Sequence, residues 1–186
     1  MILSNYLVKA FQPLVVQKVI LNLFTKSDIN DVYISWLNDP IVTRFSNQRF
    51  YSHTYETSLA YFNSFRETDN LLIKIERKSD NSFIGTMTIY YSNYHGTADI
   101  GIMLGDKSTW GKGYGWDAWN TQLPWLSQLP FIRKITAGTM RANSSMMSLL
   151  KRSGMTLEAV RFGQELLDGK PQDIVYYCFF PRDSDY

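Results

Sequence analysis

Cysteine is nearly absent from this sequence, with Cys178 the only one in 186 residues. A single cysteine allows no internal disulfide, and such chains are typical of a reducing compartment. We therefore expect a cytoplasmic protein. Cys178 stands in the apolar run IVYYCFF, where the ordinary role of a thiol is that of a small buried side chain.

Charge of one sign and long apolar runs are also missing. Lysine and arginine number 19 against 17 aspartate and glutamate, which gives a net charge of +2, and no basic run occurs. This balance predicts neither a nucleic-acid partner nor binding to an anionic membrane surface. No apolar run approaches the roughly 20 residues of a membrane span. Asn5, Lys9, Gln12 and Pro13 interrupt the moderately apolar N-terminus, so we expect no signal peptide or anchor there.

Apolar and aromatic residues, by contrast, are plentiful. Hydrophobic residues make up 45% of the chain and aromatic residues 15%, enough for one buried core at this length. The sequence has no internal repeat, no low-complexity tract and no linker rich in proline, glycine or serine. We expect a single domain over residues 1–186.

Periodicity and turn residues predict a series of strands and helices. We expect one helix to follow the capping pattern Thr25–Asp28 and run to about Asn38, with others at 54–67, 113–128 and 143–153. Pro124 should kink or shorten the third helix. Strands are expected at 19–24, 71–76, 83–91, 97–104 and 132–140, followed by a terminal hairpin that turns at Asp168-Gly169. The order β-α-α-β-β-β-α-β-α-β-β predicts a mixed α/β (α+β) domain around one sheet.

The stretch STWGKGYGWDAWN places Gly111, Gly113 and Gly115 directly before an expected helix. The first N–H groups of a helix have no internal partner, and bare backbone lets a phosphate approach them closely. The P-loop pattern needs Ser or Thr after Lys112, where Gly113 stands, and the Rossmann spacing G-x-G-x-x-G is absent. A diphosphate site is indicated, with a tight strand-to-helix corner without a ligand as the alternative.

In its context this stretch, ADIGIMLGDKSTWGKGYGWDAW, resembles the acyl-coenzyme A motif of the GNAT N-acetyltransferase superfamily. The family pattern Q/R-x-x-G-x-G/A aligns from Trp110 to Gly115, with Trp110 in place of the usual Gln or Arg. Such a form is similar to the branch of the ribosomal-protein N-terminal acetyltransferases. The segment NSSMMSLLKRSGM, 143–155, has the family's spacing from asparagine to glycine. The resemblance covers about 19–180 and leaves 1–18 outside as an N-terminal extension.

The resemblance implies a mostly antiparallel, GNAT-like sheet that splays between the strands 97–104 and 132–140, with acetyl-CoA in the gap. The pantetheine arm would pair with the backbone of 102–104, and the N–H groups of 112–115 would hold the pyrophosphate. The cofactor-binding residues implied are Ile102, Met103, Leu104, Trp110, Gly111, Lys112, Gly113, Tyr114, Gly115 and Asn143. Lys112 either neutralises phosphate or is an ordinary solvated lysine, and Asn143 is also placed as a helix N-cap. No metal is expected.

Acetyl transfer needs a neutral amine, a stabilised oxyanion and a route for the proton. The family commonly uses a carboxylate on the splayed strand as the base, which makes Asp99 the first catalytic candidate. His95 in the preceding loop is the second, since imidazole titrates near the required pH. The alternative for Asp99 is an ordinary surface aspartate at a strand end, and the alternative for His95 is a histidine that only makes local hydrogen bonds. The family's tyrosine acid falls at Leu150, so either another group takes its role or the thiolate leaves unaided.

The acceptor is the least determined part. The resemblance leaves a protein N-terminal α-amine or the amine of a small metabolite, above all a nucleotide-linked amino sugar. The loop IVTRFSNQRFYSHTY carries five rings beside two arginines; these residues are Phe45, Phe50, Tyr51, His53 and Tyr55, with Arg44 and Arg49. Rings stack on a base or sugar and arginines pair with a diphosphate, although the rings also serve to pack the loop.

The same loop has no carboxylate between Asp39 and Glu56, whereas a peptide acceptor favours acidic groups near its amine. We therefore favour, over a protein N-terminus, a small primary amine with an anionic or sugar part, such as a nucleotide-linked amino sugar. A non-catalytic module that binds acyl-CoA is the alternative of another class. The sequence leaves the oligomeric state open, with a homodimer as one option.

Overall fold

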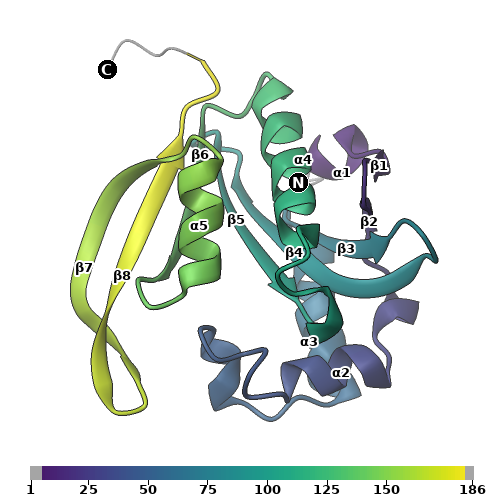
Figure 1. The fold of residues 1–186 in the computed structure, drawn as a ribbon. Helices are drawn as coiled ribbons and strands as arrows, with labels where there is room; N and C mark the ends of the chain where they lie inside the picture. The colour runs from purple at the N-terminus through teal and green to yellow at the C-terminus, as the bar shows by residue number, and fades with distance from the viewer. Residues whose placement is uncertain (1–5, 183–186) are drawn as a thin grey trace.

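The computed structural model describes residues 6–182 of the chain. Within this range eight strands form one sheet in the order β1-β2-β3-β4-β5-β6-β8-β7 (Figure 1). The strands are β1 (Leu14–Val15), β2 (Val19–Leu23), β3 (Leu71–Arg77), β4 (Ser82–Ser92), β5 (Thr97–Leu104), β6 (Lys134–Met140), β7 (Thr156–Leu167) and β8 (Lys170–Phe179). Neighbours are antiparallel except β5 and β6, which run parallel. The expected mixed α/β fold with a mostly antiparallel sheet is confirmed.

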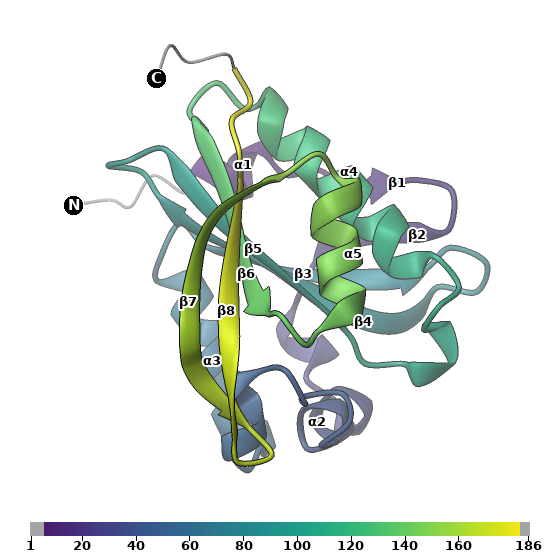
Figure 2. The ribbon, with the colours of Figure 1, turned by 60° about the vertical axis from the view of Figure 1, so that its left-hand side comes forward.

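The sheet opens at its centre because β5 and β6 pair over a short seam. The paired residues of this seam are Thr97 with Lys134, Ala98 with Ile135 and Asp99 with Thr136. Beyond it, β5 continues beside β4 as far as Leu104, whereas β6 continues beside β8 as far as Met140. The two strands therefore diverge after Asp99 (Figure 2), which confirms the expected splay.

Helices cover both faces of the sheet. They are α1 (Tyr6–Ala10), α2 (Asp31–Leu37), α3 (Tyr55–Arg66), α4 (Tyr114–Gln128) and α5 (Ser144–Arg152), and none of these described helices is long and apolar enough to cross a membrane. Successive side chains of a strand point to opposite faces. Ile73 and Ile75 of β3 lie in a buried cluster with residues of α1, α4 and α5, whereas Leu72 lies in a second cluster with residues of α2 and α3. The opened sheet thus has α4 and α5 on one face and α2 and α3 on the other.

The longest helix, α4, buries the face that its periodicity predicts. Trp119 and Leu126 are fully buried, and Leu123 is nearly so. Pro124 lies on the exposed side of the helix, and α4 continues past it to Gln128. The expected shortening at Pro124 does not occur. Pro124 cannot donate to the carbonyl of Asn120, but both residues are exposed, so the ring displaces no core packing.

The start of α2 differs from the sequence prediction. The capping pattern does form, since the Asp28 carboxylate accepts the N–H of Thr25 at 2.7 Å, but it closes a separate 3-10 turn, Lys26–Asp28. The α-helix begins at Asp31, where Asn30 Oδ1 accepts the N–H of Tyr33 at 3.0 Å. Two caps lie five residues apart, and the second one starts the helix because asparagine is among the strongest N-cap residues.

The N-terminal extension, which the family resemblance left out, packs onto the core over its described part. Leu7 is fully buried and Phe11 nearly so, and the Phe11 ring meets Trp125 edge-on with centroids 5.3 Å apart. β1 pairs with β2 and adds the outermost strand on that side of the sheet. Residues 6–18 are therefore a structural part of the sheet and core.

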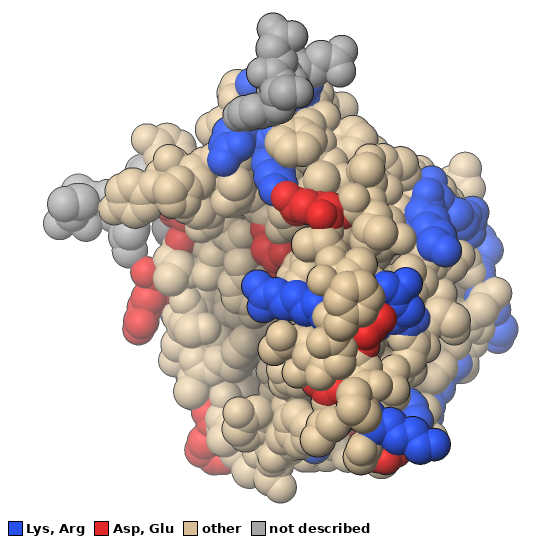
Figure 3. Space-filling model, turned by 90° about the vertical axis from the view of Figure 1, so that its left-hand side faces the viewer, with Lys and Arg blue, Asp and Glu red and all other residues tan. Residues whose placement is uncertain are grey.

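The β7–β8 hairpin shows charges of both signs on its outer face (Figure 3). Several are paired there: Arg44 lies 2.6 Å from Asp168, and Arg141 lies 3.0 Å from Asp173. Exposed pairs of this kind contribute little to stability.

Candidate active site

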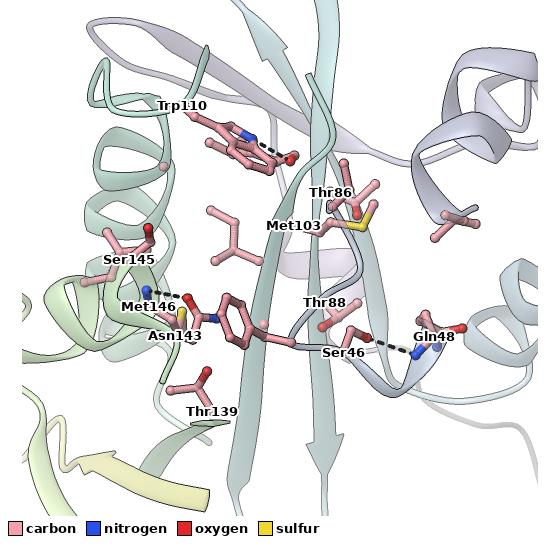
Figure 4. A pocket seen from close by; sticks show the side chains of 18 of the residues that line it. Ser46, Gln48, Thr86, Thr88, Met103, Trp110, Thr139, Asn143, Ser145 and Met146 are labelled. Carbon is pink, nitrogen blue, oxygen red and sulfur yellow. Dashed lines mark hydrogen bonds between the residues drawn. The ribbon is translucent and has the colours of Figure 1, made fainter. Parts of the chain in front are cut away.

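A cavity of about 1060 Å³ spans the open centre of the sheet. We divide the cavity into two halves. The lining residues between 109 and 152 form the α5 half, and those between 33 and 90 form the α3 half. Gly101–Leu104 of β5 lie between the two halves. Figure 4 shows the two halves: Trp110, Asn143 and Ser145 lie on one side of the central strands, and Ser46, Gln48 and Thr86 lie on the other. One continuous space therefore joins the glycine loop to the loop between α2 and α3.

The glycine loop combines left-handed backbone, open space and, among the described residues, unbonded N–H groups. Gly111 and Gly113 have φ of +70° and +86°, a region that favours glycine, and Gly113 is the N-cap of α4. A Cβ at Gly111 would meet nothing within 4 Å, so conformation and not space requires glycine there. Within residues 6–182 the N–H groups of Gly111 and Gly113 donate to no protein acceptor. These donors at a helix start fit a phosphate or diphosphate.

Lys18 lies beside this loop and was missed by sequence reasoning. Its Nζ donates to the carbonyl of Lys112 at 2.8 Å and lies 5.6 Å from the Tyr114 ring centroid. The backbone N–H of Lys18 donates to Asp117 of α4 at 2.8 Å, which fixes the start of β2 against the start of α4. Lys112 itself is exposed. Tyr114 packs against the core and, in contrast to its glycine neighbours, is not among the cavity-lining residues.

The edge of β5 faces the same cavity, and Ile102, Met103 and Leu104 all line it. Because β6 has diverged, the backbone of these described residues has no strand partner on that side. The Leu104 carbonyl is already occupied, since the indole Nε1 of Trp110 donates to it at 2.9 Å (Figure 4). Trp110, the departure from the family pattern, therefore fastens the glycine loop to the end of β5.

Helix α5 presents a polar first turn to the cavity. Asn143 Oδ1 accepts the N–H of Met146 at 3.2 Å, which confirms that Asn143 is an N-cap, and Asn143 and Ser145 both line the space. At the other end of α5 the Arg152 guanidinium stacks over the Trp116 ring at 4.1 Å. Among the described residues that line the cavity, Arg152 is the one lysine, arginine, aspartate or glutamate. A positive charge thus stands in the α5 half.

The structure separates the two candidate bases. Asp99 lies at the last pair of the seam, where its carboxylate accepts the Thr136 hydroxyl at 2.7 Å. It lines a small cavity of about 250 Å³ that shares Phe45, Gly138 and Thr139 with the large one. Although the residue stays exposed, loss of hydration raises the pKa of the Asp99 carboxyl, and the Thr136 hydrogen bond partly opposes this.

His95 lies in the turn between β4 and β5, on the far side of the seam from the opening. Its side chain is exposed, and its carbonyl accepts the Arg133 guanidinium at 2.6 Å. His95 is not among the described residues that line either cavity. Leu150, at the position of the family's tyrosine, is fully buried in the core.

Comparison with known proteins decides the family. A sequence model of the acetyltransferase (GNAT) domain matches residues 18–156. The chain belongs to the GNAT acetyltransferase family. A search of curated proteins found no match. The predicted membership of the GNAT superfamily is confirmed, and the matched range of 18–156 lies almost wholly within the expected 19–180.

Solved structures share the fold of this GNAT acetyltransferase. The ribosomal α-N-protein acetyltransferase RimL, solved with coenzyme A, has a TM-score of 0.79 at 17% identity, covering 91% of this chain and 98% of that one. Spermidine N-acetyltransferase from Vibrio cholerae, solved with CoA and spermine, has a TM-score of 0.76 at 15% identity over 88% and 95%. The microcin self-immunity acetyltransferase MccE, solved with acetyl-CoA and AMP, has a TM-score of 0.72 at 18% identity over 89% and 93%.

The arginines of the acceptor loop do not reach the cavity of this GNAT acetyltransferase. Arg44 pairs with Asp168 at 2.6 Å. Arg49 donates to the carbonyl of Leu166 at 3.0 Å and stacks over Phe50 at 4.2 Å. Neither is among the described lining residues. The two arginines tie the loop to the β7–β8 hairpin, so the expectation that they pair with an acceptor diphosphate finds no support.

The rings of that loop divide between packing and lining. Phe45, Tyr51 and His53 line the α3 half, whereas Phe50 and Tyr55 are not among its lining residues. Residues outside the loop complete the half, namely Tyr33 of α2, Ser58 and Tyr61 of α3, and Thr86, Thr88 and Tyr90 of β4. Sequence reasoning missed these six. The alternation of Thr86, Thr88 and Tyr90 is the one signal that could have found part of the set, because it places three hydroxyls on one face of a strand.

Proposed function

We propose that this GNAT acetyltransferase moves the acetyl group of acetyl-CoA to the primary amine of a small molecule, with amino sugars as the favoured acceptors. The observation that carries the proposal is the continuous cavity. It joins an anion-binding loop and an unpaired strand edge in the α5 half to a hydroxyl-lined space in the α3 half. Coenzyme A or acetyl-CoA is present in the RimL, spermidine N-acetyltransferase and MccE structures, which supports the choice of donor.

The α5 half has the groups that acetyl-CoA needs. The N–H groups of Gly111 and Gly113 would hold the pyrophosphate, and the ammonium of Lys18, 2.8 Å from the Lys112 carbonyl, would add positive charge next to it. The unpaired edge at Ile102 and Met103 offers backbone groups to the amides of the pantetheine arm. Acetyl-CoA, when bound, supplies an acetyl thioester as the acyl donor.

Asp99 is our candidate for the group that takes the proton from the attacking amine. It lies at the point where β5 and β6 separate, next to the large cavity across the shared residues Phe45, Gly138 and Thr139. The proton would pass to its carboxylate directly or through one water. The raised pKa makes this carboxylate a stronger base than a fully hydrated one. Because Leu150 stands in place of a tyrosine acid, we expect the thiolate to leave without a proton donor there.

The shape of the α3 half favours a small acceptor over a peptide. Part of its lining is deeply buried, since Tyr33 and Ser58 are 2% and 3% exposed, whereas Tyr51 is 68% exposed. A peptide N-terminus needs an extended groove with backbone edges. The likeness to RimL, with a TM-score of 0.79, favours the second candidate, a protein N-terminal α-amine.

Thiol release from acetyl-CoA, measured over a panel of amines, tests the proposal. The panel holds glucosamine, nucleotide-linked amino sugars, spermidine and peptides with a free N-terminus. We expect the highest kcat/KM with amino sugars. Turnover confined to the peptides would contradict a small-molecule acceptor and support acetylation of a protein N-terminal α-amine. Binding of acetyl-CoA without thiol release on any amine would contradict an acetyltransferase activity altogether.

A further inference from the structure

One buried hydroxyl in the α3 half has no partner. Ser58 is 3% exposed, and its Oγ makes no hydrogen bond within the described part of the chain. Serine in a helix commonly donates to a carbonyl one turn back, as Ser64 of the same helix does to Tyr61 at 2.6 Å. Ser58 does not, although it lines the cavity. Since buried polar groups are nearly always hydrogen-bonded, this Oγ points to a partner that enters the cavity.

Most of the polar side chains that line this half together with Ser58 carry hydroxyl groups, and none of these described residues is an aspartate, glutamate, lysine or arginine. Tyr33 of α2, Tyr61 of α3, and Thr86 and Thr88 of β4 line the same half. The Tyr61 hydroxyl lies 2.9 Å from that of Tyr90. Burial raises the pKa of both Tyr33 and Tyr61 above the ordinary range, so both phenols stay neutral at every working pH. This set offers donors and acceptors for a hydroxylated ligand.

The same half lacks a counter-charge for an ammonium group. Its described lining residues include no aspartate, glutamate, lysine or arginine. The titratable groups that face it are four tyrosines (Tyr33, Tyr51, Tyr61, Tyr90), His53, whose Nε2 lies 3.1 Å from the Gln48 carbonyl, and Asp99 in the adjoining cavity. Moving an ammonium into such a site costs hydration without an ion pair in return. The site therefore selects amines that are already neutral near pH 7.

We propose that the acceptor is a weakly basic primary amine that bears hydroxyl groups and no second positive charge, and that Ser58 Oγ binds one of those hydroxyls. This rests on the proposed acetyl transfer and narrows its substrate class. Amines near the α-amino pKa of about 8 keep a sizeable neutral fraction at pH 7, whereas amines near the lysine pKa of about 10.4 keep very little. Polyamines, which carry several such charges, are excluded from the class.

The first arm of the test compares glucosamine with cyclohexylamine, a ring of similar size that is strongly basic and has no hydroxyls. At pH 7 we expect kcat/KM for glucosamine to be higher by about 100-fold or more, from the neutral fractions alone. Between pH 7 and 9 the value for cyclohexylamine should rise about tenfold per unit, while that for glucosamine levels off. Equal values at pH 7, or faster turnover of spermidine, would overturn the inference.

The second arm tests Ser58 itself with Ser64→Ala as the matched control on the same helix. We expect Ser58→Ala to raise the KM for glucosamine about five- to tenfold, with an unchanged KM for cyclohexylamine at pH 9. The melting temperature and the acetyl-CoA Kd should stay at the wild-type values, as in Ser64→Ala. An equal rise in KM for both amines would assign Ser58 a structural role and contradict its binding of an acceptor hydroxyl. A protein that binds acetyl-CoA but releases no thiol on any amine would instead overturn the acetyltransferase function on which the inference rests.

Discussion

At the scale of single residues, Gly113 and Gly154 share a left-handed backbone conformation. Gly113 has a φ of +86° at the start of α4, and Gly154 has a φ of +78° after the end of α5. A side chain is strained at both, but only Gly113 lines the cavity. This pair separates the cost of strain from the cost of losing a ligand contact.

We expect Gly113→Asp to weaken acetyl-CoA binding at least tenfold, or about 1.4 kcal/mol. The added carboxylate would stand where the pyrophosphate binds. Isothermal titration measures the change. Gly154→Asp is the control, and it should bind acetyl-CoA as the wild type does. Equal losses in the two variants would mean that strain and not the loop's contact with phosphate is responsible.

A second prediction concerns the base. Asp99→Asn should lower kcat far more than it changes the Kd for acetyl-CoA, because the amide cannot accept the proton of the attacking amine. In the wild type, kcat should fall as the pH drops through the raised pKa of Asp99. Thr136→Val removes the hydrogen bond that lowers this pKa, so it should move that limb to higher pH. A pH profile left unchanged in both variants would move the role to another group.

The same residue predicts an effect on stability. In the folded chain the pKa of Asp99 is raised, so the folded state holds this proton more tightly than the unfolded state. Stability from this group is present at low pH and is lost as the pH rises from the unfolded pKa through the folded one. At pH 7 the melting temperature of Asp99→Asn should therefore be no lower than that of the wild type. A clear decrease would show that the carboxylate stabilises the fold.

At the scale of elements, β2 and the glycine loop act as a pair. Lys18 directly precedes β2, and its Nζ donates to the Lys112 carbonyl. Asp117 of α4 accepts the backbone N–H groups of Lys18 and Val19. The ammonium thus stands beside the loop whose N–H groups would bind phosphate. Lys78 makes the same kind of bond, from its Nζ to the Val16 carbonyl at 2.8 Å, but Val16 lies outside the glycine loop.

We expect Lys18→Met to weaken acetyl-CoA binding by about three- to tenfold, the range of a partly screened contact between ammonium and phosphate. Its Kd should also depend less on salt than that of the wild type. Lys78→Met is the control and should change neither quantity. Titrations at two ionic strengths give both. Equal behaviour of the two variants would contradict the role of Lys18.

The elements that could be predicted from the sequence are those set by local chemistry. Asn143 caps α5, Gly154 ends it, and Asp168-Gly169 turns the hairpin, because each depends on neighbours within a few residues. The start of α2 could not be chosen, since two capping residues compete within one short segment. The site was predictable on its α5 side, where a motif exists. The partners of Arg44 and Arg49 lie 124 and 117 residues further along the sequence, and no local pattern predicts these contacts.

At the scale of the whole molecule, the α3 half shows why the acceptor is difficult to predict from the sequence. Its lining comes from α2, α3, β4 and the loop between the helices, and each contributes a few common residues such as Ser58 and Thr88. None of these is unusual in its own segment. Only the fold brings the hydroxyls to one place and leaves carboxylates out of it.

The short seam between β5 and β6 has a mechanical consequence. It divides the sheet into two leaves, β1 to β5 and β6 to β8, that are hydrogen-bonded to each other through Thr97–Asp99 on one side and Lys134–Thr136 on the other. A pantetheine arm in the opening would offer its amides to the β5 edge and serve as a removable strand between the leaves. Bound acetyl-CoA would thereby add hydrogen bonds at the junction of the two leaves, and release of coenzyme A would remove them at the end of each turnover.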